Sequence, residues 1–260
     1  NDGNLRYKVK KQEIKKIIGL KILKIKRRSK YLLFYFNGNF LMIVHLGMTG
    51  KFFIQDRKKN KQRTSFYYDV TNYKEQHNRL IFTFKNNLKL IYNDVRKFGF
   101  IKIVNSTIAN NISHLRILGP EPFSKYYNFQ YFKNYISKKR RVIKDLLMDQ
   151  KFISGLGNIY VNEILFWSKI KPIRKLNKLK DNELKKVIYI TKKILKKAII
   201  NGGSSIINFS NSAGKKGNFQ QYFKVYARKG QKCSNLHCKG VIKKIVISNR
   251  ASFFCPICQK

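Results

Sequence analysis

The residues of this chain best suited to binding a metal are its four cysteines, all of which lie among the last 28 of 260 residues. Four residues separate Cys233 from Cys238, sixteen follow before Cys255, and two separate Cys255 from Cys258. Two close pairs joined by a short spacer can bring four thiolates into one tetrahedron, which suits Zn²⁺. Disulfide bonds are the alternative, but the absence of other cysteines and of a secretion signal favours one structural zinc ion. Four thiolates leave no open coordination position, so this metal would fold the tail rather than catalyse.

The spacer between the cysteine pairs, "KGVIKKIVISNRAS", alternates apolar and basic residues. This pattern predicts two short strands joined by a turn, with Arg250 near the tip. Such a hairpin would hold a cation toward a phosphate group.

The charge of the chain is strongly unbalanced, with 57 Lys and Arg against 12 Asp and Glu, and the net charge of +45 is spread along the whole length. Such a field favours a polyanionic partner, either nucleic acid or an anionic membrane surface. An AT-rich genome would also enrich lysine, and many of these lysines would then be solvated. The hydrophobic fraction of 43% suffices for ordinary cores, and no run reaches the roughly 18–20 apolar residues that span a bilayer.

The elements that would position these residues fall into two kinds. From Gly19 to about Val104 short β-rich runs recur, separated by turn residues; they read "KYLLFYF", "FLMIVHL", "KFFIQ", "RLIFTF", "KLIYN" and "FGFIKIV". They predict an antiparallel sandwich or barrel, with "NG" at 37–38 as a hairpin turn. The polar segment 56–76 is predicted as a surface loop.

After "RILGPEPFS", which is predicted as an interdomain hinge, the period of the apolar residues changes to that of helices. The helical patterns are "FQYFKNYI", "VIKDLLMD", "IYVNEILFWSK" and "DNELKKVIYITKKILKKAII". The third begins at Asn158 after a glycine-containing turn, so its first backbone N–H groups could face a phosphate, although a simple corner between helices is the alternative. A glycine-containing loop at 209–232 is expected to lead into a strand and then the cysteines.

Six segments in this order resemble the bacterial formamidopyrimidine-DNA glycosylases: "HLGMTG", "NDVRKFG", "LGPEP", "LLMDQKFISGLGNIYVNEILF", "FQQYFKVYARKG" and the four-cysteine hairpin. The resemblance implies an α+β multidomain fold. Its parts would be an N-terminal antiparallel β-sandwich (1–115), a hinge (116–124), a helix-two-turn-helix DNA-binding domain (125–221) and a zinc finger (222–260).

The resemblance also implies an activity in base-excision repair. Family members excise oxidised purines, such as 8-oxoguanine and formamidopyrimidines, and then cleave the strand as AP lyases through an imine and β/δ-elimination. They bind double-stranded DNA containing oxidised bases or abasic sites in the cleft between their domains, and they extrude the damaged base. Met48, Arg96 and Phe98 match the residues that fill the vacated space. Without the resemblance, Met48 and Phe98 would be read as core and Arg96 as a surface ion pair.

Residues that match the family's DNA-backbone contacts are Lys30, His45, Lys97, Asn158 and Arg250. Lys30 matches a lysine that supports catalysis near the lesion phosphate. Lys97 stands where a second arginine is usual, and Val95 replaces the usual proline, so we expect a looser loop. The loop 211–221 matches the one that closes over the extruded base; its candidate residues are Gly214, Lys215, Gly217 and Phe219.

The family's nucleophile is an N-terminal proline with a glutamate beside it, and neither has a counterpart at the start "NDGNLRYKVK", where Asn1 and Asp2 align with a later part of the pattern. The favoured interpretation is an incomplete sequence that lacks the first helix and part of the first strand. The alternative is a shortened protein that binds damaged DNA without cutting it. As printed, the chain is expected to bind DNA better than it cuts it.

Two other functions remain open from the sequence. An endonuclease VIII-like glycosylase shares the domain plan but prefers oxidised pyrimidines, whereas the Met48, Arg96 and Phe98 set and the loop before "FQQ" favour purines. A non-catalytic zinc-containing DNA-binding or ribosomal-RNA-binding protein would explain the charge and the cysteines. We expect a monomer in the bacterial cytoplasm, associated with the nucleoid and not with a membrane.

Overall fold

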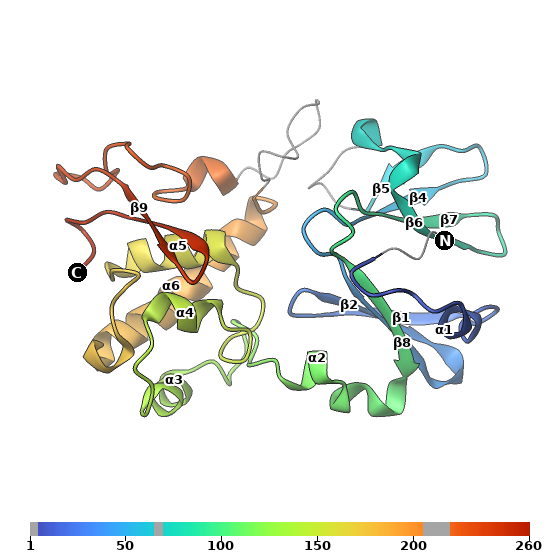
Figure 1. Ribbon diagram of the computed structural model, residues 1–260, viewed down its shortest axis with the longest axis horizontal. Coiled ribbons are helices and arrows are strands. Elements are labelled where there is room, and N and C mark those ends of the chain that lie inside the picture. The colour runs from blue at the N-terminus through green and yellow to red at the C-terminus, as the bar shows by residue number, and fades with distance from the viewer. Residues whose placement is uncertain (1–4, 65–69, 205–218) are drawn as a thin grey trace. The chain divides into compact units, whose positions relative to one another are not determined.

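The computed structural model of the chain describes residues 5–64, 70–204 and 219–260 (Figure 1). These residues form two compact units: unit 1 runs to Arg116 and also includes Ser204, and unit 2 runs from Ile117 onward. The finer division of the chain at 116–124 and 221–222 stays a prediction. No helix within the described ranges is both long and apolar enough to cross a membrane.

Unit 1 contains two four-stranded antiparallel sheets, which confirms the predicted sandwich. The first sheet has the order β1-β2-β3-β8 and the second has the order β5-β4-β7-β6. The strands of the first sheet are β1 (Ile22–Arg28), β2 (Tyr31–Phe36), β3 (Phe40–His45) and β8 (Phe100–Asn105). Those of the second are β4 (Lys51–Gln55), β5 (Lys61–Arg63), β6 (Asn78–Thr83) and β7 (Lys89–Asn93).

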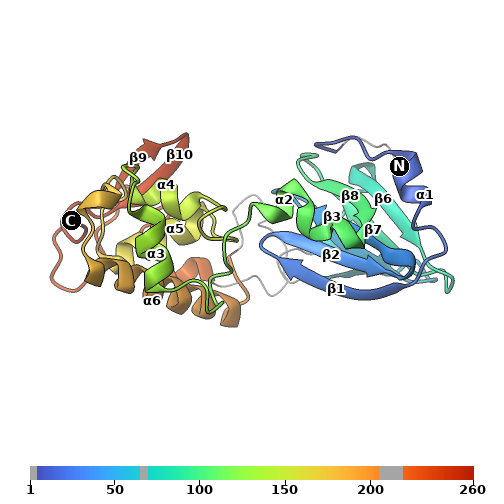
Figure 2. The ribbon, with the colours of Figure 1, turned by 90° about the horizontal axis from the view of Figure 1, so that it is seen from below.

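The first sheet buries side chains on both faces, because apolar residues occupy consecutive positions of β2 and β3. Phe34 on β2 belongs to the core that it shares with residues of the second sheet, including Phe52 and Tyr92. Leu33, one position earlier, belongs to a smaller cluster with Ile112. That cluster is covered by a 3₁₀ helix (Ser106–Asn111) and α2 (Ser113–Arg116), which lie across this sheet in Figure 2.

All six predicted β-rich runs form strands, and the "NG" turn joins β2 to β3. The sequence pattern did not reveal β1, β5 or α1 (Lys11–Lys15). β1 is an edge strand in which Leu23 and Ile25 are exposed, so it lacks the alternation of a half-buried strand. β5 has only three residues and lies in the segment predicted as a polar loop.

The helices of unit 2 agree with the four predicted patterns. They are α3 (Phe129–Ile136), α4 (Ile143–Met148), α5 (Asn158–Ser168) and α6 (Asp181–Ile200). α5 is buried on nearly all sides, whereas α6 buries one stripe that includes Leu184, Val187 and Ile194. The turn between α4 and α5 is held by Gln150, whose Oε1 accepts from the N–H of Gly155 at 2.8 Å.

The predicted C-terminal hairpin is present as β9 (Lys243–Ile247) and β10 (Arg250–Phe254). The strand expected between the loop at 209–232 and the cysteines is absent, because turns occupy the residues after a 3₁₀ helix (Phe219–Tyr222). The carboxylate of Glu163 on α5 instead accepts the backbone N–H groups of Lys224, Val225 and Tyr226 at 2.9–3.0 Å. Backbone donors held by a side chain in this way are not available to a sheet.

We expect Gly99→Ala to lower the free energy of unfolding by about 2–3 kcal/mol, because interiors resist added volume. Its Cβ would overlap Tyr92 Oη and lie 2.8 Å from the His45 carbonyl oxygen. Urea unfolding followed by circular dichroism measures the change. Gly230→Ala is the control: its Cβ would meet nothing within 4 Å, and only its φ of 83° is unfavourable. A loss for Gly99→Ala no larger than for the control would contradict the steric argument.

Candidate nucleic-acid interface and metal centre

Two loops of unit 1, residues 46–50 and 94–99, are joined by the buried carboxylate of Asp94. It accepts hydrogen bonds from Thr49 Oγ1 and from the N–H of Gly99, the latter at 2.9 Å. Thr49 Oγ1 in turn accepts from the N–H of Arg96 at 3.0 Å. Tyr92 is also a donor to Asp94, and burial together with this carboxylate raises the pKa of Tyr92, so its hydroxyl keeps its proton. The buried acid therefore fixes the backbone on both sides of Arg96.

The backbone of these loops is closely packed. Gly47 has φ 66°, and a Cβ there would lie 2.7 Å from the N of Gly99. Lys97 has φ 60°, so it occupies the left-handed region that few residues other than glycine adopt. The two loops thus lie against each other with no room for a side chain at Gly47.

The side chains of Met48, Arg96 and Phe98 form an exposed cluster on these loops. Met48 is 56% exposed and Phe98 is 46% exposed, so neither belongs to the core of unit 1. Arg96 lies between them, with Nη1 3.3 Å from Met48 Sδ and Cζ 4.6 Å from the Phe98 ring centroid. The structure therefore brings these three predicted residues together in solvent. Apolar groups held in water in this way are typical of a surface that contacts a partner.

His45 ends β3, and its ring stacks on that of Phe100 at a centroid distance of 5.9 Å. Its Nδ1 accepts from the N–H of Gly47 at 3.0 Å, which leaves Nε2 as the donor of the neutral ring. Burial lowers the pKa of His45, and the positive charge of Lys30 lowers it further, with smaller contributions from Arg6 and His114. Lys30 itself is exposed. His45 is thus a neutral hydrogen-bond donor beside a lysine at neutral pH.

The four cysteines of unit 2 meet in one cluster. Their Sγ atoms all lie within 4.8 Å of one another, with 3.7 Å between Cys233 and Cys258 and 3.6 Å between Cys238 and Cys255. No disulfide bond joins any of them. Four sulfurs bound tetrahedrally at about 2.3 Å from one ion lie about 3.8 Å apart, so the observed spacing fits a four-thiolate metal site.

The chemistry around these sulfurs also fits a cation. Burial raises the pKa of Cys233 to about 12, so a thiolate there requires a compensating positive charge. Three N–H groups already point at sulfur. Asn235 Nδ2 lies 3.1 Å from Cys258 Sγ, the N of Gly240 lies 3.4 Å from Cys238 Sγ, and the N of Cys258 lies 3.4 Å from Cys255 Sγ. Donors of this kind orient metal-bound thiolates.

The first turn of α5 is joined to the C-terminal hairpin. Asn158 Nδ2 donates to the carbonyl of Ala251 at 3.0 Å. Asn162, one turn later, donates to the Asn158 carbonyl and accepts from the N–H of Phe253 at 2.7 Å. The predicted residues Asn158 and Arg250 are therefore parts of one assembly in unit 2, in which Arg250 precedes the anchored Ala251 and is itself exposed.

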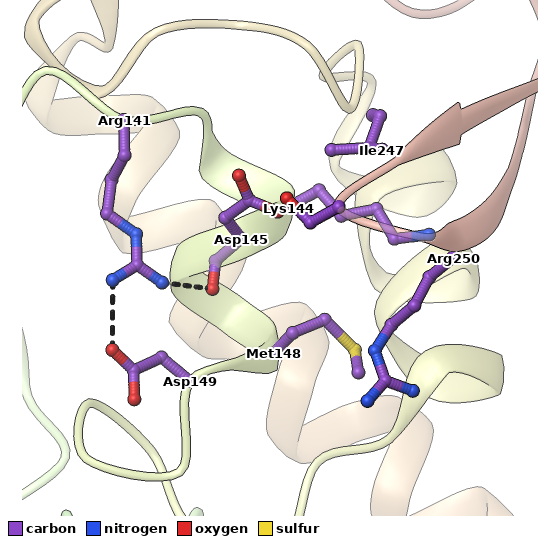
Figure 3. A pocket seen from close by; sticks show the side chains of 8 residues that line it. Arg141, Lys144, Asp145, Met148, Asp149, Ile247 and Arg250 are labelled. Carbon is purple, nitrogen blue, oxygen red and sulfur yellow. Dashed lines mark hydrogen bonds and ion pairs between the residues drawn. The ribbon is translucent and has the colours of Figure 1, made fainter.

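Sequence reasoning missed Lys144, which is only 1% exposed. Its Nζ donates to the carbonyl of Ala251 at 2.9 Å and to Ser252 Oγ at 2.7 Å. In Figure 3 it lies behind the pocket of about 380 Å³ that Arg250 also lines, and the Arg141–Asp149 ion pair forms the opposite wall. Burial, and then the charge of Arg250, lowers the pKa of Lys144 to about 8. In a chain with 57 Lys and Arg, no sequence signal separates this lysine from solvated ones.

The residues predicted to cap an extruded base are only partly described. Gly214, Lys215 and Gly217 lie outside the described residues. Phe219 is 3% exposed, and its ring lies 5.8 Å from that of Tyr160 on α5, within the core of unit 2. A capping role for this loop stays a prediction.

Comparison with known proteins gives one consistent result. The model of the formamidopyrimidine-DNA glycosylase N-terminal domain matches residues 1–101, and the model of the formamidopyrimidine-DNA glycosylase H2TH domain matches residues 118–210. A formamidopyrimidine-DNA glycosylase of Rickettsia bellii is 39% identical over 257 residues, which cover 99% of this chain and 88% of that protein. That of Roseobacter denitrificans is 34% identical over 260 residues, covering 100% of this chain and 90% of that protein.

Solved structures give the same result. A complex between the Lactococcus lactis Fpg and an abasic site containing DNA has a TM-score of 0.81 and 33% identity, and the match covers 96% of this chain and 86% of that one. A complex of the wild-type Lactococcus lactis protein with an N7-Benzyl-Fapy-dG containing DNA has a TM-score of 0.80 and 34% identity, with the same shares covered.

The pKa of Lys144 leads to a prediction about stability. Its pKa is about 8 in the folded chain against an ordinary value of 10.5, so between these values the unfolded chain binds more protons at this site. The contribution of Lys144 to the free energy of unfolding therefore rises with pH across this window. We expect Lys144→Met to lose this rise between about pH 8 and pH 10.5, as measured by urea unfolding.

Lys151→Met, at an exposed position in the same unit, is the control and should keep the pH dependence of the unchanged chain. Equal pH dependence in all three proteins would show that Lys144 is not desolvated as described.

Proposed function

We propose a function for this chain from the premise that it belongs to the formamidopyrimidine-DNA glycosylase family. The chain is a DNA glycosylase of base-excision repair. We propose that its substrate is double-stranded DNA containing oxidised purines or abasic sites, and that its residues extrude the damaged base, grip the backbone and support strand cleavage as an AP lyase. The structural neighbours bound to abasic and Fapy-dG DNA support this substrate class.

The observation that carries the proposal is the exposed cluster of Met48, Arg96 and Phe98 on loops fixed by Asp94. An extruded base leaves a gap in the stack, and apolar side chains that enter it replace lost stacking. Arg96, held between the two apolar groups, can donate hydrogen bonds to the base left without its partner. These side chains are exposed before DNA arrives, and their backbone is already ordered, so little has to be rearranged on binding.

We propose that Lys30, His45, Lys97, Asn158 and Arg250 contact the DNA backbone. All five carry hydrogen-bond donors, and phosphate contacts of this kind fix position without reading sequence. His45 would donate from its neutral ring, whereas Lys30, Lys97 and Arg250 add positive charge. The first N–H groups of α5, at Asn158, add the positive end of a helix.

We propose that the four-cysteine cluster holds one structural Zn²⁺. When bound, the ion would supply the cross-link that holds the two cysteine-bearing turns together, and it would have no open position for a reacting group. Cys233, Cys238, Cys255 and Cys258 would be its ligands. The spacing of their sulfurs and their lack of disulfide bonds support this assignment. We also propose a monomer that acts in the cytoplasm, where thiols stay reduced.

The function is tested by excision from duplexes that carry one 8-oxoguanine or one thymine glycol, with borohydride present to trap an imine. We expect the product of the whole open reading frame to release 8-oxoguanine faster than thymine glycol and to give a covalent protein–DNA band. The 260-residue chain, in which no residue matches the family's proline and glutamate, is expected to bind the damaged duplex without forming this band. Faster release of thymine glycol would favour the pyrimidine-specific alternative, and equal affinity for damaged and intact duplex without excision would favour a non-catalytic binder. The 260-residue chain and the product of the whole open reading frame are assayed side by side.

Met48→Ala and Phe98→Ala should each slow 8-oxoguanine excision by about tenfold, since stacking on a base contributes about 1–3 kcal/mol. Single-turnover rates on the 8-oxoguanine duplex measure this effect. Cleavage at a preformed abasic site should fall less, because no base has to be extruded. Ile81→Ala, at a 51% exposed position of the same unit, is the control and should leave both rates unchanged. Equal losses on both substrates would contradict a wedge role.

Cys258→Ser should release the metal and weaken DNA binding by about tenfold or more, because the cluster and the hairpin of Arg250 share one small domain. Zinc content by mass spectrometry and DNA affinity by fluorescence anisotropy measure the two effects. Unit 1 should keep its β-sheet circular dichroism signal. Ser234→Ala, an exposed neighbour that offers no thiolate, is the control. Unchanged zinc content in Cys258→Ser would refute the four-thiolate site.

A further inference from the structure

A second pocket of unit 2, with a volume of about 530 Å³, lies beside the cysteine cluster and shares no lining residue with the pocket at Arg250. It is formed by the end of α5, the beginning of α6 and the two turns that carry the cysteines. Its lining includes Ser168, three lysines, two apolar side chains and the cysteines Cys238 and Cys258. A volume of this size accommodates one or two side chains of a ligand.

The apolar part of this pocket comes from the two cysteine turns. Leu236 is 86% exposed and Ile257 is 57% exposed, and each lies within two residues of a cysteine. Structural metal sites do not require apolar side chains to face solvent. Large apolar side chains kept in water beside a concave surface are typical of a site that a partner covers.

The polar part of the pocket is cationic. Lys169, Lys186 and Lys260 are exposed and line it. The one acid among its described lining residues is Glu183, whose carboxylate is bound by Arg174 at 3.0 and 3.2 Å. The charge of Glu183 is therefore largely neutralised. Four thiolates with one Zn²⁺ would add a net charge of −2 beside the pocket, which the three lysines exceed by one, so the balance favours an anionic ligand.

Ser168 adds an independent observation. It ends α5 and is 3% exposed, it lines the pocket, and its Oγ has no hydrogen-bond partner among the residues that the structure describes. A buried hydroxyl without a partner is unfavourable, and such groups commonly find one in a ligand or an ordered water.

The walls of the pocket are held firmly in place. The N–H of Lys260 donates to the Lys169 carbonyl at 3.0 Å, and the Lys260 carbonyl accepts from the N–H of Lys171 at 2.9 Å. Gln259 is fully buried, and its side chain bonds to the Ile170 carbonyl and to the N–H of Cys255. A site of fixed shape binds without the loss of entropy that ordering would require.

We propose that this pocket binds an acidic peptide segment of a partner protein, with an aliphatic or aromatic side chain between Leu236 and Ile257 and carboxylates on the lysines. The backbone of a DNA duplex would use the lysines but would leave both apolar side chains in water, so DNA fits this pocket less well. The inference rests on the pocket alone and holds whichever lesion the protein excises.

The test uses the metal-loaded full chain and a fluorescein-labelled hexapeptide, Asp-Glu-Asp-Leu-Asp-Phe, with fluorescence anisotropy at about 150 mM salt to screen non-specific attraction. We expect saturable binding, and we expect binding at least about tenfold weaker when Leu and Phe of the peptide are replaced by Ser. Lys186→Glu and Leu236→Ser should each weaken binding by about tenfold. The excision rate on a damaged duplex should not change in either variant.

Each variant has a matched control outside the pocket. Lys185→Glu changes the same charge one position earlier on the exposed side of α6, and Val246→Ser removes an apolar side chain that is 69% exposed on β9. Both should bind the peptide as the unchanged chain does. Equal binding of the apolar and serine peptides, or equal losses in variants and controls, would reduce the effect to net charge and overturn the proposal. If intact duplex displaced the peptide at a concentration equal to the dissociation constant of the duplex, the pocket would be assigned to DNA instead.

Discussion

Two buried carboxylates hold the backbone on which the exposed groups of this protein depend. Asp94 in unit 1 accepts from Thr49 and Gly99, and Glu163 in unit 2 accepts three successive backbone N–H groups. Burial raises the pKa of Glu163, and the three N–H donors oppose this shift. In a chain with only 12 acids and 57 basic residues, these acids are used to organise loops rather than to neutralise surface charge. Removing either would leave several buried donors without an acceptor, which is costly.

Buried polar side chains also join the hairpin of the cysteine cluster to the helices of unit 2. Asn158, Asn162 and Lys144 each bond to β10, so the hairpin that carries Arg250 is fixed to α4 and α5 and not only to the cysteines. Phe166 of α5 also packs in one cluster with Cys233 and Cys255. A hairpin of two strands is marginally stable by itself. The cysteine cluster and the helices therefore both hold the hairpin that carries the exposed Arg250.

Much of this arrangement could be predicted from the sequence, because it rests on periodic patterns and on residue spacing. Six of the eight strands of the sandwich, the four helices, the hairpin and the cysteine cluster follow from such signals. Lys144 and Glu163 could not be found in this way, because their roles depend on contacts with residues 107 and 61–63 positions away in the chain. β1 was not predicted because it forms a strand by pairing with β2 at the edge of the sheet and buries no face that an alternating sequence pattern would reveal. The prediction of a strand after Phe219 was wrong for a related reason. The carboxylate of Glu163, distant in the sequence, accepts the backbone N–H groups that a strand would have used.

Net charge cannot by itself give such a protein selectivity. A charge of +45 attracts any polyanion, with an affinity that falls steeply as salt rises. Selectivity then has to come from groups whose interaction is not electrostatic. We propose that in this chain these groups are apolar side chains held in water: Met48 and Phe98 in unit 1, and Leu236 and Ile257 in unit 2. Each pair lies beside cations that attract a partner to it. The cations would raise the local concentration of every anionic partner, and the apolar pair would retain only a partner with a gap to fill or an apolar group to bury.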